Sequence, residues 1–75
     1  MLEAIKKYFD YELNGLRVIA RFHPHPEETW LAKDFVKQST LSRGMGVILF
    51  AQLNGETYEE VAKLYDEFKE EVEKI

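Results

Sequence analysis

The hydrophobic and polar positions along the chain repeat with the period of an α-helix in two long segments. In residues 57–75 the apolar side chains recur every three or four positions, at Tyr58, Val61, Tyr65, Phe68, Val72 and Ile75. Residues 2–22 have the same spacing and carry polar side chains on the opposite side. Their apolar side chains are Leu2, Ile5, Phe9, Leu13, Leu16 and Ala20. The pattern predicts two amphipathic helices that each pack one side against other helices.

The middle of the chain predicts a longer helix with a weaker pattern. Pro24 disfavours helical geometry at the residue before it, whereas Pro26 suits the first position of a helix. One helix is therefore expected to end before the first proline and another to begin at the second. Residues 45–51 are apolar on nearly every side. Because Gly44 and Gly46 lie at the start of this segment, we expect a kink there.

A turn and the start of the last helix follow. Asn54 and Gly55 form a turn signal, and Thr57 with Glu60 three residues later has the spacing of a capping box. We therefore predict helices at residues 2–22, 26–53 and 57–75.

Two segments are also compatible with β-strands. Residues 16–22 follow Asn14-Gly15, a dipeptide common in hairpin turns, and residues 47–53 form an apolar run. We favour a helix at the first because the helical period continues in phase through Gly15, where glycine costs only about 1 kcal/mol. If the two segments paired as strands, the protein would be a small α+β domain.

The favoured reading is one all-α domain over residues 1–75, an up-down-up three-helix hairpin bundle with a long central helix. The third helix covers the apolar end of the central helix, and the first helix reaches that end only with its first few residues. Apolar surface left bare usually binds a protein, and the simplest partner is a second copy. We predict a homodimer with four residues at its interface, Met45, Val47, Ile48 and Phe50.

The composition is that of a folded domain without covalent cross-links. The 75 residues are 45% hydrophobic and 32% charged, and they include no cysteine, which fits a reducing compartment. Charged residues near the beginning interrupt any apolar signal sequence, and the longest uncharged window, residues 44–55, is too short to span a bilayer. We expect a cytoplasmic protein that does not bind membranes.

Negative charge is concentrated at one end of the chain. Residues 56–75 carry eight of the fourteen acidic residues but only three of the ten basic ones. This distribution argues against direct binding of nucleic acid, which needs a basic stripe. It also predicts a surface for a basic partner, formed by Asp66, Glu67, Glu70 and Glu71.

Candidate chemical sites are weak. A metal could be held by four residues, His23, His25, Glu27 and Glu28, but two histidines held between prolines in a turn supply too few ligands. We favour a helix-connecting turn in which Arg21 pairs with Glu27 or Glu28. We expect no metal site and no cofactor.

Anion binding and nucleophilic catalysis are the other chemical hypotheses. Arg17 and Arg21 lie one turn apart, but no second basic cluster converges with them. Ser39, Thr40 and Ser42 are far from either histidine, so no base would activate them. We expect small hydroxyl residues here to permit close helix approach or relieve a bend, and we expect no enzyme activity.

Three segments carry a resemblance to known proteins. They are a charged opening helix (LEAIKKYFDYEL), a central run (RGMGVILFAQL) and an acidic amphipathic ending (YEEVAKLYDEFKEEVEKI). The chain resembles short uncharacterised proteins encoded by phages and mobile elements of Gram-positive bacteria. The resemblance implies a small accessory or host-modulating protein and assigns no functional residues.

Two functions follow from these observations. The first is a non-enzymatic helical protein that acts through protein–protein contacts and self-association. The alternative is a host-directed inhibitor whose acidic helix engages a basic, nucleic-acid-binding protein.

Overall fold

The computed structural model describes residues 1–22 and 26–75, and within them every side chain except those of residues 22 and 26–33. The described residues form three helices and no strand: α1 (Leu2–Phe22), α2 (Pro26–Leu53) and α3 (Tyr58–Lys74). The predicted all-α fold is confirmed, with helix ends within one residue of those expected. The α+β alternative is wrong, because residues 16–22 lie in α1 and residues 47–53 lie in α2.

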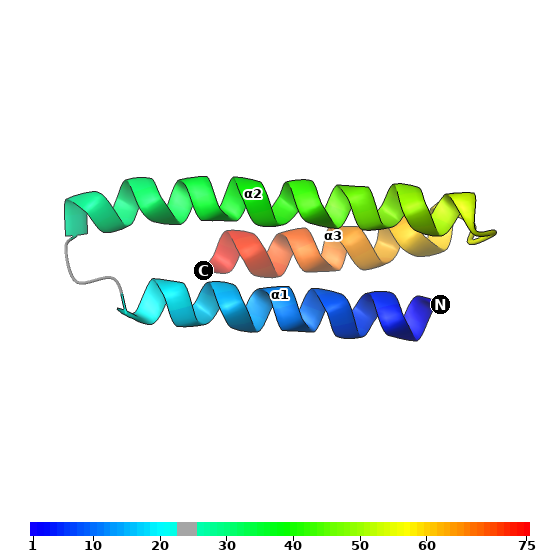
Figure 1. The fold of residues 1–75 in the computed structure, drawn as a ribbon, viewed down its shortest axis with the longest axis horizontal. Coiled ribbons are helices and arrows are strands. Elements are labelled where there is room, and N and C mark those ends of the chain that lie inside the picture. The colour runs from blue at the N-terminus through cyan, green and yellow to red at the C-terminus, as the bar shows by residue number, and fades with distance from the viewer. Residues whose placement is uncertain (23–25) are drawn as a thin grey trace.

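The helices are arranged as an up-down-up bundle (Figure 1). α2 runs antiparallel to α1, and α3 turns back along α2, so that α1 and α3 point the same way and the N terminus lies near the end of α2. The molecule is elongated, with extents of 44 × 16 × 16 Å. The 28 residues of α2 rise about 42 Å, which is nearly the full length of the molecule. α2 is therefore the element along which the other two helices pack.

The turn between α2 and α3 has the predicted chemistry. Gly55 has a φ of 100°, a left-handed conformation that glycine adopts without steric cost. Asn54 closes the end of α2, because its side-chain Nδ2 donates to the carbonyl of Phe50 at 2.8 Å. Thr57 caps α3, its hydroxyl accepting the backbone N–H of Glu60 at 3.4 Å. The chain therefore reverses within residues 54–57.

All three helices contribute to one hydrophobic core. α1 supplies Ile5, Phe9, Leu13 and Leu16, which are four of its six predicted apolar positions. The other two helices supply Ile48, Ala51, Val61, Phe68 and Val72. The core lies where α3 covers both other helices, and it therefore fixes the direction in which each helix faces.

α2 is continuous through its two internal glycines. The expected kink is absent, since the helix is unbroken over Pro26–Leu53 and is drawn straight in Figure 1. Gly44 is needed for packing instead: a Cβ there would lie 2.9 Å from Cε2 of Phe68. Thr40 is buried, and its hydroxyl donates to the Val36 carbonyl at 2.8 Å, so this polar group is satisfied inside the helix.

Over the described residues, none of the three helices combines the length and the apolar composition that crossing a bilayer requires.

Candidate interaction surface

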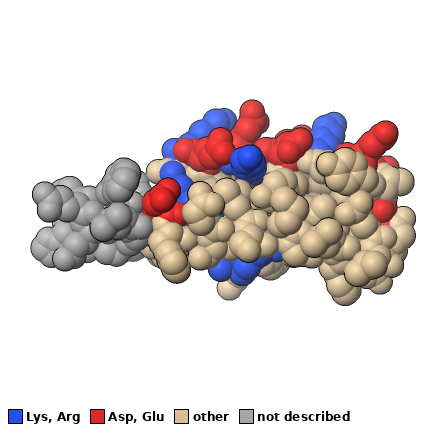
Figure 2. Space-filling view, turned by 90° about the horizontal axis from the view of Figure 1, so that it is seen from above, with Lys and Arg blue, Asp and Glu red and all other residues tan. Residues whose placement is uncertain are grey.

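The side of α2 that faces away from the core carries large apolar side chains. Leu53 is 86% exposed, and Leu49 and Phe50 are each more than half exposed. Met45 lies one helical turn before Leu49 and is exposed too. In Figure 2, which looks down on α2, a wide area of uncharged atoms fills the centre, and charged side chains gather along one long edge. α2 thus has apolar residues on two sides, of which the core covers one.

The four predicted interface residues do not all lie on this surface. Met45 and Phe50 are exposed on it, and Val47 is half-buried. Ile48 is 4% exposed and belongs to the core of the protomer, so a substitution there reports on folding. Sequence reasoning missed Leu49 and Leu53. A segment that is apolar all round does not reveal which positions face the neighbouring helices.

The four predicted acidic residues lie on α3. Asp66, Glu67 and Glu70 are exposed. Glu71 is half-buried and sits 3.6 Å from Arg17 of α1 and 3.2 Å from Lys74. The pair with Arg17 links α1 to α3. Among the ion pairs of the described residues, none involves the other three acidic residues, so this structural contact is particular to Glu71.

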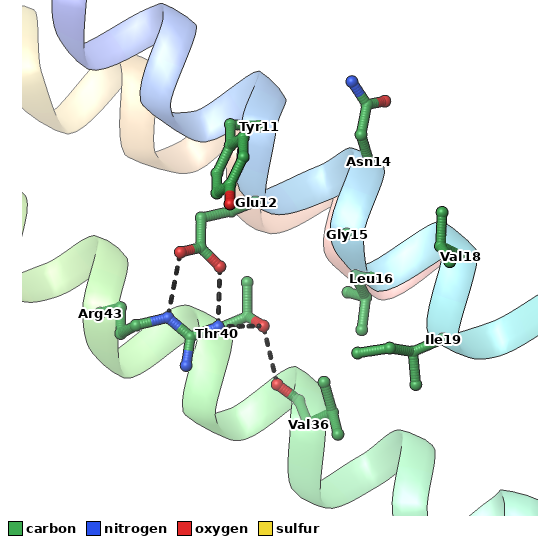
Figure 3. A pocket seen from close by; sticks show the side chains of 10 residues that line it. All are labelled: Tyr11, Glu12, Asn14, Gly15, Leu16, Val18, Ile19, Val36, Thr40 and Arg43. Atoms are coloured by element: carbon green, nitrogen blue, oxygen red, sulfur yellow. Dashed lines mark hydrogen bonds and ion pairs between the residues drawn. The ribbon is translucent and has the colours of Figure 1, made fainter.

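A groove of about 290 Å³ runs between α1 and α2 (Figure 3). Its apolar lining includes Val18 and Ile19 from α1 and Val36 from α2. At the other end lie Glu12, Thr40 and Arg43, which form a connected polar cluster. The groove therefore combines an apolar floor with one interhelical ion pair.

The ion pair in this groove is bidentate. Arg43 Nη2 donates to Glu12 Oε2 at 2.7 Å, and Arg43 Nε donates to Glu12 Oε1 at 3.1 Å. Arg43 Nη2 also donates to Thr40 Oγ1 at 3.2 Å. The guanidinium is thereby held against α1, and no free cation is presented to an anionic ligand at this point. Sequence reasoning missed this contact because 31 residues separate the partners.

The cluster also shifts three ionisation equilibria. Hydrogen bonding to Arg43 lowers the pKa of Glu12 from its ordinary value, and the same hydrogen bonds raise the pKa of Arg43. Burial, followed by the neighbouring Glu12 carboxylate, raises the pKa of Tyr8. Glu12 and Arg43 therefore stay charged and paired at neutral pH, a state that suits a structural clamp.

The structure describes only part of the two remaining candidate sites, the predicted histidine turn and the arginines of α1. His23 and His25 lie outside the described residues, and so do the side chains of Glu27 and Glu28 with which Arg21 was expected to pair. Arg17 lies near Glu71 and donates from Nη1 to Asn14 Oδ1 at 3.3 Å.

Within the described part of the chain, no group of three or more histidine, cysteine, aspartate or glutamate side chains is placed to hold a metal ion. Comparison with protein-family models, with curated proteins and with solved structures finds no match to this chain.

Proposed function

We propose that this chain is a non-enzymatic helical protein that acts through protein–protein contacts, beginning with its own self-association. The supporting observation is the exposed apolar side of α2, where Met45, Leu49, Phe50 and Leu53 follow one another over little more than two turns. Large apolar side chains gathered on one face of a small protein are typical of a binding surface, because leaving them in water is unfavourable.

Charge favours a protein as the occupant of this surface. The chain has a net charge of −4, and between Phe35 and Leu53 its only charged residues are Lys37 and Arg43. A membrane-binding helix usually flanks its apolar side with several lysines or arginines, and a nucleic-acid-binding one needs a basic stripe. A cytoplasmic protein partner, including a second copy of this chain, suits an uncharged surface.

Analytical ultracentrifugation of the intact chain tests the proposal. Over a range from about 1 to 300 µM, where weak protein dimers form, we expect the average mass to rise from the 8.9 kDa of one chain toward twice that value. A mass of one chain at every concentration, with helical circular dichroism unchanged, would refute self-association.

The acidic side of α3 supports a second candidate function, a host-directed inhibitor that engages a basic, nucleic-acid-binding protein. The supporting observation is that Asp66, Glu67 and Glu70 are all exposed on this one helix. Such a partner would be captured from a bacterial lysate at low salt and lost near 1 M salt, where screening acts within about 3 Å.

A charge-reversal variant makes this second test specific. Glu67→Lys combined with Glu70→Lys should abolish capture while the helix content stays the same, since both side chains are exposed. A partner that binds this variant as tightly as the parent would exclude the acidic side of α3 as the binding surface.

A further inference from the structure

A second helical seam runs along the outside of α2. Six positions recur at alternating spacings of 4 and 3 residues, the pattern that places residues along a coiled-coil seam. We call them the outer seam: Phe35, Ser39, Ser42, Gly46, Leu49 and Leu53. Five of them are exposed and Ser39 is half-buried, so no other helix of the protomer covers them.

The outer seam has large residues at its ends and small ones in its middle. Phe35 is 74% exposed at one end, and Leu49 and Leu53 are exposed at the other. Between them lie two serines and a glycine, and no seam position is charged. Arg43, the nearest charged residue beside the small positions, is drawn toward α1 by its ion pair with Glu12. The seam is therefore free of unpaired charge along its length.

Gly46 is not explained by the packing of a single protomer. A Cβ at this position would meet no atom within 4 Å, in contrast to Gly44, whose Cβ would meet Phe68. Glycine is a poor helix former, and α2 is a regular helix here, so nothing within the protomer favours it. Close approach of another backbone to the outside of the helix would favour it.

We propose that the outer seams of two copies pair antiparallel about a two-fold axis near residue 44. In this register Phe35 lies opposite Leu53 of the partner subunit, Ser39 opposite Leu49 of the partner subunit, and Ser42 opposite Gly46 of the partner subunit. Each layer near the ends then contains at least one large side chain. The middle layers contain only serine and glycine, so the two helices come closest together there.

The antiparallel orientation follows from packing density. A parallel pair would place serines opposite serines in the middle and leucines opposite leucines at one end. The facing leucines would hold the helices apart. Reversing one helix sets Leu49 against a serine, so that only the Phe35–Leu53 layers place two large side chains opposite each other. Antiparallel helix dipoles also attract one another, and the arrangement is isologous, as expected for a closed dimer.

The size of the seam predicts a reversible dimer. From Phe35 to Leu53 it is about 27 Å long, and half of a helix circumference is about 17 Å, so the two copies cover roughly 900 Å². This lies below the size of standard stable interfaces and indicates association in the micromolar range or weaker. The acidic residues of α3 are not in the seam, so pairing does not require them to approach one another.

This inference rests on the proposed self-association, and a matched pair of variants separates the two. Gly46→Gln places a bulky side chain in the outer seam, and Gly15→Gln makes the same change in α1, where a Cβ also meets no atom within 4 Å. Both variants should keep their helix content, because glutamine is a better helix former than glycine. In ultracentrifugation we expect Gly46→Gln to weaken the dimer at least about tenfold and Gly15→Gln to leave it unchanged.

The possible outcomes are distinct. If the parent chain dimerises and Gly46→Gln dimerises equally well, the outer seam is wrong although self-association stands. If Gly15→Gln alone weakens the dimer, the second copy binds the α1–α2 groove, and the seam is again wrong. A parent chain that stays monomeric overturns both proposals.

Cysteine cross-linking tests the register. Because the sequence contains no cysteine, every disulfide must form between the introduced residues. A mixture of Ser39→Cys and Leu49→Cys chains, oxidised in air with copper phenanthroline, should form a disulfide-linked pair containing one chain of each kind. Ser39→Cys alone should not cross-link, because its two copies would lie about 15 Å apart along the helices, beyond the reach of a disulfide. Efficient cross-linking of Ser39→Cys with itself would refute the antiparallel register.

Discussion

Phe9 of α1 and Phe68 of α3 stack with their ring centroids 4.3 Å apart and 12° between the ring planes. Both side chains are almost fully buried. The Phe68 ring also lies against Gly44 of α2, since a Cβ built on that glycine would sit 2.9 Å from Phe68 Cε2. The three helices therefore meet around a single aromatic ring, and this contact sets how closely α3 approaches α2.

The stacked rings should be energetically coupled. Phe9→Leu and Phe68→Leu should each destabilise the protein, and the double variant should lose less than the sum, with a coupling of about 0.5–1.5 kcal/mol typical of an aromatic pair. Urea unfolding of the four proteins measures the cycle. Phe9→Leu combined with Thr57→Ala is the control, and its effects should add because Thr57 lies about 16 Å along the helix from Phe68, the stacking partner of Phe9.

Gly44→Ala should destabilise the protein, contrary to the usual effect of replacing glycine inside a helix. The added methyl group has no room beside Phe68, so we expect a loss of about 1–3 kcal/mol in the free energy of unfolding. Gly15→Ala is the matched control, since its methyl group meets no atom within 4 Å and should add up to about 1 kcal/mol. Equal stabilisation by both substitutions would contradict the close contact at Gly44.

The Glu12–Arg43 pair should make stability depend on pH in the acid range. Because the pKa of Glu12 is lowered in the folded state, its contribution is complete above the ordinary glutamate value of about 4.3 and is lost as the pH falls through the lowered value. We expect this contribution to be about 0.5–1 kcal/mol, since Arg43 is half exposed and screened by solvent.

Urea unfolding between about pH 6 and pH 2 measures this contribution. Glu12→Gln should flatten this part of the profile, and so should Arg43→Gln, which removes the cause of the shift. Combining the two should flatten it no further. An acid dependence that is unchanged in Glu12→Gln would show that other carboxylates account for it.

Thr57→Ala should lower the stability of α3 by about 1 kcal/mol, because the backbone N–H of Glu60 loses its side-chain acceptor. Thr57→Ser retains the hydroxyl and should be nearly neutral. Thermal unfolding followed by circular dichroism compares the two variants. A loss of the same size in Thr57→Ser would attribute the effect to the threonine methyl group.

Much of the fold can be predicted from the sequence because two helices have one apolar side each. In α1, the three- and four-residue spacing of Ile5, Phe9, Leu13 and Leu16 identifies the side that is buried. In α3 the same period identifies Val61, Phe68 and Val72, although Tyr58, at the first position of the helix, is largely exposed. The turn at Gly55 and the cap at Thr57 are local features, and local sequence is sufficient to predict them.

The orientation of α2 was decided only by tertiary structure. Its apolar residues surround the helix, so periodicity alone does not distinguish Ile48, which is buried, from Leu49, which is exposed. The choice depends on where α1 and α3 pack, and α3 can pack closely only where Gly44 leaves room for Phe68. Arg43 then faces Glu12 from 31 residues away, a pairing with no local signal. Repeating patterns determine an amphipathic helix, whereas a helix that is apolar on all sides takes its orientation from the shapes of its neighbours.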